Sequence, residues 1–425
     1  MAKPKLALIP AAQGDKFYSV LPSDGVGDFD FTRGSSATRI NAQGLIETVA
    51  DTSSRLNYDL LNGKVVNCPH YLLEPASTNF ITYSNNISQW TSSDNTVSPN
   101  VITSPDGGLN GGKVIVNNGA TGANIRPMDS VAATSGLDYV FSVFVKAGEF
   151  DKINLDFSNA VFGSAGATFN LTSGILTDFD AVNVSQGIED YGNGWYRCYL
   201  VAAAITNGSG ALILRLDANG AGDGVKGLYV YGAQYEQKSF LTSYIPTTGT
   251  AITRAAESAN GSGNAATFND SEGVLMAEIS AENETSSSAR RISILNTTSN
   301  RILIGAESAS STIRTVITVG GSSKFDVSSS QLVTTNNKIA VKYSSNGSEM
   351  YINGFTVGIS AIDSSFPSST LNDLQFGSGN GNSPFYGKTR QIQYFDSALT
   401  DAQLETLTSW TSLQEMITSQ LYTNY

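Results

Sequence analysis

The chain has 425 residues, of which 40% are hydrophobic and only 15% are charged. This length is too great for one ordinary hydrophobic core, so two or three domains are expected. The net charge of −12 disfavours nucleic acid and anionic lipid as partners, because both are bound by basic surfaces.

Residues 1–78 predict a compact, turn-rich N-terminal region. Its first apolar run ends at Pro10, which is too short for a signal-peptide core or a membrane span, so we expect the chain to fold in a cytoplasm. Cys68 and Cys198 are the only cysteines, too few for a disulfide-stapled fold. Two reduced, buried thiols are expected, and one bond between them is the alternative.

Residues 79–257 predict a β-sandwich. Apolar residues alternate with other residues along several short segments separated by Gly, Asn and Ser, which is typical of strands joined by tight turns. Asn193-Gly194 directly before Trp195 indicates a hairpin whose second arm begins at that tryptophan. The alternating residues are Leu137, Tyr139, Phe141, Val143 and Val145, then Ile153, Leu155 and Phe157, and then Leu212, Leu214 and Leu216.

Residues 265–425 predict a second β-sandwich and a short C-terminal helix. Small polar residues fill 255–266, so a linker is expected there, with a domain boundary near residue 258. Asn353-Gly354 lies between two alternating runs and predicts a hairpin.

The C-terminal helix is predicted to begin at a capping box of Thr400 and Gln403. Its apolar stripe is expected to pack on the chain's own sandwich, with a subunit interface as the alternative. The residues of the stripe are Leu404, Leu407, Trp410, Leu413, Ile417 and Leu421.

Three sets of motifs resemble segments of bacteriophage fibre proteins. Residues 1–80 resemble the N-terminal region of phage head-spike and tail-fibre proteins. The matching segments are Phe17-Tyr-Ser-Val-Leu-Pro22, Phe31-Thr-Arg-Gly-Ser-Ser-Ala-Thr-Arg39, Asn41-Ala-Gln-Gly-Leu-Ile-Glu47 and Leu72-Leu-Glu-Pro-Ala-Ser-Thr-Asn79. Residues 80–254 resemble the carbohydrate-binding-like jelly roll that follows, through Gly232-Ala-Gln-Tyr-Glu236 and Thr242-Ser-Tyr-Ile-Pro-Thr247.

The third set resembles a concanavalin A-like, laminin-G-type sandwich and covers residues 265–410. Its segments are Lys338-Ile-Ala-Val-Lys-Tyr343, Met350-Tyr-Ile-Asn-Gly354, Gly387-Lys-Thr-Arg-Gln-Ile-Gln-Tyr-Phe395 and Leu399-Thr-Asp-Ala-Gln-Leu404. This fold hosts lectins, adhesins and glycanases alike, so it does not fix a function by itself.

The resemblance implies a non-enzymatic virion protein made of tandem β-sandwiches after a small N-terminal region. That region would attach the chain to other capsid or tail proteins and support oligomerisation, commonly as a homotrimer. The assembled virion, formed in the host cytoplasm, would bind host-surface glycans during adsorption. The alternatives are a purely structural capsid decoration or head fibre and, less expected, a polysaccharide depolymerase.

Catalytic side chains are sparse. His70 is the only histidine and lies beside a proline, without a nucleophile elbow, so a structural role is expected. Glycoside hydrolysis needs two carboxyl groups across a cleft. Glu282 and Glu284 have the spacing of an alternating acidic motif, but Glu278 is out of step, and a solvated strand end is expected instead.

No cofactor is expected, although calcium is possible. Asp217, Asn219 and Asp223 offer oxygen ligands in a Gly-rich loop, as does the loop around Asp106. Plain turns, which need the same residue types, are the favoured interpretation.

A sugar site is predicted to combine an aromatic platform with polar groups that form hydrogen bonds. The candidates are Tyr343, Tyr351, Phe385, Tyr386 and Arg390 in the last sandwich and Trp195 in the middle one; Phe355 and Tyr229 are further candidates.

Overall fold

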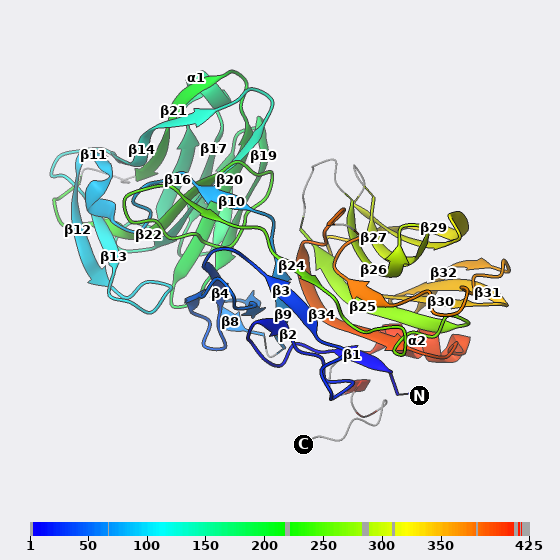
Figure 1. Cartoon of the computed structure of the whole chain (residues 1–425). Helices are drawn as coiled ribbons and strands as arrows, with labels where there is room; N and C mark the ends of the chain where they lie inside the picture. The colour runs from blue at the N-terminus through cyan, green and yellow to red at the C-terminus, as the bar shows by residue number, and fades with distance from the viewer. Residues whose placement is uncertain are drawn as a thin grey trace.

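The computed structural model describes residues 3–66, 68–216, 222–282, 289–307, 311–379, 381–411, 415, 416 and 418. Antiparallel strands dominate it, and the all-β fold class predicted from the sequence is confirmed. Two β-sandwiches lie side by side, and the N-terminal residues run beneath both of them (Figure 1).

The middle sandwich consists of two six-stranded sheets within the described residues. The predicted strands and the hairpin at Asn193-Gly194 are confirmed, and both turn residues have positive φ. One sheet has the order β11 (Thr91–Ser93), β14 (Ala123–Ala133), β21 (Gly208–Leu216), β16 (Lys152–Phe157), β17 (Gly166–Asn170) and β18 (Ile175–Phe179). The other has the order β12 (Asn95–Ile102), β13 (Gly111–Val116), β22 (Gly227–Glu236), β15 (Asp138–Lys146), β20 (Trp195–Ala203) and β19 (Asn183–Asp190). The short helices η1 (Ile87–Gln89) and α1 (Asn159–Phe162) flank them.

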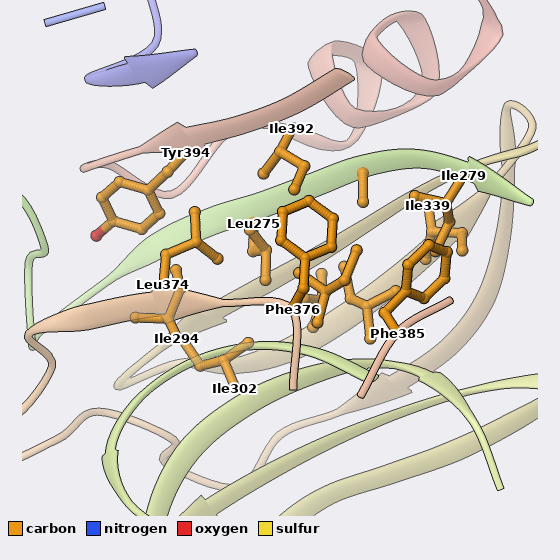
Figure 2. Packing of buried hydrophobic residues seen from close by; sticks show 14 of the residues in the cluster. Leu275, Ile279, Ile294, Ile302, Ile339, Leu374, Phe376, Phe385, Ile392 and Tyr394 are labelled. Atoms are coloured by element: carbon orange, nitrogen blue, oxygen red, sulfur yellow. The ribbon is translucent and has the colours of Figure 1, made fainter. Parts of the chain in front are cut away.

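The C-terminal sandwich encloses the second large core. Figure 2 shows aliphatic and aromatic side chains from both sheets meeting between them, among them Leu275, Ile294 and Phe376. One sheet contains β32 (Phe355–Ser360), β31 (Gly347–Ile352), β30 (Asn337–Ser344), β25 (Gly273–Ala281) and β34 (Gly387–Phe395). The opposite sheet contains β29 (Ser322–Leu332), β28 (Thr312–Val319), β27 (Asn300–Ala306), β26 (Arg290–Thr297) and β33 (Asp373–Gln375).

The N-terminal residues extend the sheet of the C-terminal sandwich. β1 (Leu6–Leu8) and β9 (His70–Leu73) both pair with β34, and β6 (Leu56–Asn57) pairs with β9. The boundaries at residues 78, 257 and 265 therefore remain a prediction, since strand pairing crosses them. The remaining strands are β2 (Lys16–Phe17), β3 (Phe29–Thr32), β4 (Ala37–Ile40), β5 (Ile46–Val49), β7 (Leu60–Leu61), β8 (Lys64–Val65), β10 (Ser77–Asn79), β23 (Ile252–Arg254) and β24 (Ser258–Asn260).

The segment predicted as a linker, 255–266, is packed against the N-terminal region. β24 pairs with β3, and Ala259 and Ser262 are fully buried. The composition of 255–266 was misleading because small residues also fit where two backbones approach closely. One of the two cysteines also departs from its prediction, since Cys198 is buried but Cys68 is exposed.

Helix α2 (Asp401–Ser409) begins at the predicted capping box, which is confirmed. Leu404, Leu407 and Trp410 pack with Val274 and Met276 of β25, so this part of the stripe faces the chain's own sandwich. Leu413, Ile417 and Leu421 lie outside the described residues.

Arg33 and Glu74 of the fibre-like motifs belong to a cluster of buried ion pairs. Arg55 binds Glu74 at 2.6 Å and also pairs with Glu257, while Arg33 binds Glu257 at 2.6 Å. Arg254 completes the cluster through Glu74 at 2.9 Å. Because every side chain here is almost fully buried, the cluster ties the N-terminal region to the segment that joins the two sandwiches.

The segment that closes the middle sandwich is fixed in the same manner. Gln234 donates to Glu236 and accepts from the Ile245 amide at 2.6 Å. The Thr242 hydroxyl donates to Glu236 at 2.7 Å, and Asn79 donates to the Ile245 carbonyl. These contacts give the motif from Gly232 to Thr247 a structural role, because a buried polar group needs its partners.

Candidate functional site

Four of the six predicted sugar-binding residues belong to the hydrophobic cores. Tyr343 and Phe385 are 0% exposed, and Figure 2 shows Phe385 inside the C-terminal core. Tyr351 packs in the cluster beneath α2, and the Trp195 indole donates to the Thr103 carbonyl from a buried position. The prediction that these four residues form a stacking platform for a sugar is wrong, because a sugar cannot reach a ring that is already covered by protein.

The other two predicted residues lie nearer the surface. Arg390 binds Asp59 at 2.5 Å and donates to Asn336 at 2.8 Å, so its guanidinium is engaged within the chain. Tyr386 is half-buried against the C-terminal core.

The two further aromatic candidates are also accessible. Phe355 is 76% exposed, and Tyr229 lies below the Lys113 ammonium. Neither of them lines the groove described below.

The proposed calcium loop is described only in part, since Asp217 and Asn219 lie outside the described residues. Asp223 accepts hydrogen bonds from the Val225 and Lys226 amides, as a turn residue does, and these bonds lower the pKa of Asp223 to about 2. Within the described part of the chain, no three His, Cys, Asp or Glu side chains gather as metal ligands. Calcium binding at this loop therefore stays a prediction from the sequence.

His70 is enclosed in β9, where burial lowers the pKa of its imidazole to about 3. It contacts Asn57 at 3.1 Å, and Asp59 lies 3.7 Å away. A ring held neutral and covered on all sides supports the sheet and does not reach a substrate. Glu284 lies outside the described residues.

The strongest candidate site is a groove where the three parts of the chain meet, which we call the junction groove. Two adjoining cavities of about 200 and 280 Å³ share Ile40, Asn57, Glu189, Tyr191 and Lys388. The N-terminal region contributes β4 and β6 to the groove wall. The middle sandwich contributes β19 and the residue after it, and the C-terminal sandwich contributes β34.

The junction groove combines aromatic and polar side chains. Tyr58 and Tyr191 are half-buried, and Asn57 and Asn62 lie along the same wall. Arg197 lines the groove with a side chain that is only 2% exposed, and its Nε has no hydrogen-bond partner among the described residues. Aromatic faces beside amide and guanidinium donors are the groups that bind sugar hydroxyls and rings.

Most charges in the groove are already paired. Lys388 binds Asp59 at 2.6 Å, and Arg39 binds Glu47 at 2.8 Å. Glu74 is held by the buried arginines described above.

Two carboxylates in the groove differ from the rest. Glu189 on β19 and Glu282 directly after β25 make no side-chain hydrogen bond or ion pair within the described part of the chain. Burial, with the negative charge of Glu74, raises the pKa of Glu282 to about 7. Glu189 is exposed to solvent, whereas Glu282 is half-buried.

Sequence reasoning singled out Glu282 and missed the other groove residues. No recognisable functional motif surrounds Asn57, Tyr58 and Asp59 in the sequence, and none surrounds Glu189. Asn57 lies near Lys388 because β6 and β9 are added to the sheet that contains β34, and Glu189 lines the groove from the middle sandwich. No local sequence pattern predicts the pairing of β9 with β34 or of β6 with β9.

Residues 264–405 match the family described as the concanavalin A-like lectin/glucanases superfamily. The C-terminal sandwich is therefore a concanavalin A-like domain, in agreement with the resemblance of residues 265–410. No curated protein matches the chain. Among the described residues, none of the helices has the length and apolar character needed to traverse a lipid bilayer.

Several solved structures resemble part of the chain. The sialidase carbohydrate-binding module CBM40 of Ruminococcus gnavus, bound to α2,3-sialyllactose, is 15% identical with a TM-score of 0.28, over 32% of this chain and 83% of that one. The heptameric SAP-like pentraxin of Limulus polyphemus is 16% identical with a TM-score of 0.28, over 34% and 72%. The NanB sialidase of Streptococcus pneumoniae is 17% identical with a TM-score of 0.28, over 33% and 24%.

Proposed function

We propose that this chain is a non-enzymatic carbohydrate-binding protein of a bacteriophage particle, displayed as a homo-oligomer and used for adsorption to host-surface glycans. The observation that carries the proposal is the junction groove, whose two adjoining cavities are lined by Tyr58, Tyr191, Asn57, Asn62 and Arg197. The Arg197 Nε has no hydrogen-bond partner among the described residues. The concanavalin A-like match at 264–405 supports a carbohydrate ligand, and the fibre-like motifs support the virion.

Display on an oligomer suits a shallow groove. Several copies on one particle raise the overall affinity for a surface rich in the same glycan, even when each groove binds weakly.

A glycan array with the purified full chain tests the binding step. We expect bound glycans whose signal falls about tenfold or more in Tyr191→Ala, because stacking on an aromatic face is lost. Phe355→Ala is the matched control, since that ring is exposed outside the groove. Equal losses in both variants, or no glycan bound at all, would overturn the proposal.

Phage adsorption tests the biological step. Purified protein should compete with particles for host cells, and Tyr191→Ala should compete poorly. A phage that lacks the protein and its appendage yet adsorbs normally would instead favour a purely structural decoration.

Glycan hydrolysis is a second candidate, favoured by one observation. Glu189 and Glu282 line the same groove, and glycosidases use two carboxyl groups on either side of the scissile bond. A raised pKa, as at Glu282, is a property of a general acid. Release of reducing ends from host polysaccharide, abolished in Glu282→Gln, would establish this activity and overturn the non-enzymatic proposal.

A further inference from the structure

We infer that the junction groove binds the end of a glycan chain and excludes sugars in the interior of a longer chain. The inference rests on the proposed glycan-binding function and adds the part of the glycan that is recognised. It follows from where the groove is closed and where it is open to solvent.

One end of the groove is closed by a contact between two turns. β7 and β8 form a hairpin whose two loop residues, Asn62 and Gly63, both have positive φ, as in the tight turns that join paired strands. A Cβ built on Gly63 would lie 2.6 Å from the Cα of Gly192, in the turn after β19. Asn62 and Tyr191, which precede the two glycines, both line the cavity. The two backbones therefore touch at the end of the cavity, and a sugar ring cannot pass between them.

The other end of the groove is closed by the buried ion pairs. Glu74 and Ser243 line only the cavity of about 200 Å³, so they lie away from the contact between the turns. The Ser243 hydroxyl donates to Glu74 at 2.6 Å and accepts from Arg55 and Arg254, both at 2.8 Å. Because both arginines are almost fully buried, protein fills the space behind this wall, and the groove does not continue through it.

The groove opens to solvent between these two ends. Glu189 borders both cavities and is exposed, and Arg39, Tyr58 and Tyr191 are half-buried along the walls. Cavities of about 200 and 280 Å³ together reach the range of small-ligand pockets, roughly 300–1,000 Å³, which suits a short chain end better than a long run of sugars.

The closed ends discriminate between the two parts of a glycan by steric exclusion. A sugar in the interior of a chain carries a neighbour on each side, and one of the two would overlap the Gly63–Gly192 contact or the wall at Ser243. A terminal sugar carries one neighbour, which leaves the groove on the open side past Glu189. Overlap of this kind rejects a ligand without weakening the contacts made to the correct one.

A glycan array of matched pairs tests the inference with the full chain. Each pair presents the same disaccharide once as the outermost unit and once with one further sugar attached to it. We expect each glycan that binds through Tyr191 to lose about tenfold or more of its signal in the extended form, because the added sugar overlaps a wall of the groove.

A shortened hairpin should remove this preference. The Val66 amide donates to the Asp59 carbonyl at 2.8 Å, so replacing residues 60–65 by Asn-Gly keeps a tight turn but removes the contact with Gly192. The ratio between the two members of a pair should then approach one, even if both signals change. Leu61→Ser is the matched control, since that side chain is 67% exposed on the same hairpin and does not line the groove. It should keep the preference.

The possible outcomes separate this inference from the function on which it rests. Equal signals within the matched pairs overturn the inference with the full chain alone, whether or not the shortened variant folds. A preference that the folded, shortened variant retains also overturns it, because the exclusion then does not depend on the closed end. If binding depends on Tyr191 but not on the chain end, the proposed function stands while the inference fails. If no glycan binds, both fail.

Discussion

Single residues in this chain differ most in whether their charges are paired. The cluster of Arg33, Arg55 and Arg254 with Glu74 and Glu257 is buried, and each carboxylate is shared between two guanidinium groups. Burying ions is costly, and the cost is recovered only when every partner is in place. The cluster therefore specifies how the N-terminal region meets the segment between the sandwiches, more than it adds to net stability.

Replacing one arginine of this cluster should destabilise the protein, because the remaining buried charges lose a partner. We expect Arg55→Met to lower the free energy of unfolding by about 3–5 kcal/mol, since Glu74 and Glu257 each lose a buried partner. Urea unfolding followed by circular dichroism measures it. The control is Arg126→Met, whose ion pair with Asp129 is exposed and should change stability by about 1 kcal/mol or less. Similar effects in both variants would show that burial is not the decisive factor.

Glu282 gives the opposite case, a carboxyl group without a partner. Its folded pKa of about 7 lies above the ordinary value of about 4.3, so the folded state holds this proton more tightly than the unfolded chain. The resulting stability is complete below about pH 4.3 and is lost as the pH rises through 7. Among the described residues of the groove, Lys388 opposes the shift and Glu74 reinforces it.

We expect the free energy of unfolding to fall between pH 5 and pH 8 as Glu282 ionises. Glu282→Gln should remove part of that slope and make the protein more stable than the parent at pH 8. Urea midpoints at several pH values measure this, with Glu405→Gln as the exposed control. An unchanged slope in Glu282→Gln would mean that the carboxyl group is solvated in the folded state.

At the scale of single elements, strand pairing leaves little room at certain glycines. Gly227 begins β22, and a Cβ built there would lie 1.9 Å from the Val114 carbonyl oxygen of β13. No rotamer relieves a clash between Cβ and backbone, so the two strands would have to separate.

Gly227→Ala should therefore destabilise the middle sandwich by roughly 3 kcal/mol, the upper range for overpacking. The measurement is the urea midpoint together with amide hydrogen exchange of β13. Gly34→Ala is the control, because nothing lies within 4 Å of its Cβ, and it should stay within about 0.5 kcal/mol of the parent. Normal protection of β13 in Gly227→Ala would contradict the close pairing of β13 with β22.

At the scale of the whole molecule, the N-terminal residues belong to the C-terminal sandwich as much as to a region of their own. β1 and β9 pair with β34, and Tyr71 and Leu73 join the core formed by the two C-terminal sheets. A chain can pair its first and last strands in this way because sheet neighbours need not be neighbours in sequence.

A truncated chain that begins at residue 80 should consequently lose more than an attachment region. We expect β34 to become an unpaired edge and the core around Tyr394 to open, which would increase dye binding to exposed apolar surface and accelerate proteolysis after residue 264. Protease resistance equal to that of the full chain would show that the C-terminal sandwich folds independently.

Local patterns in the sequence determined much of this protein. Period-two alternation identified β15, β16 and β21, Asn-Gly dipeptides identified two hairpins, and Thr400 with Gln403 identified the start of α2. Each of these signals acts between residues close in the chain, and the motifs that resemble fibre proteins are of the same local kind.

The tertiary structure alone decided which aromatic rings are covered and where the groove lies. Tyr343 alternates along β30 as a surface residue also could, and Phe385 lies in the segment before β34; both are buried because the two C-terminal sheets pack against each other. The groove contains Asn57, Glu189 and Lys388 from three parts of the chain. Asn57 and Lys388 meet because β6 and β9 join the sheet of β34, and Glu189 is contributed by the middle sandwich. Alternation specifies two faces of a strand, but the packing of distant strands determines which face is buried and which side chains meet.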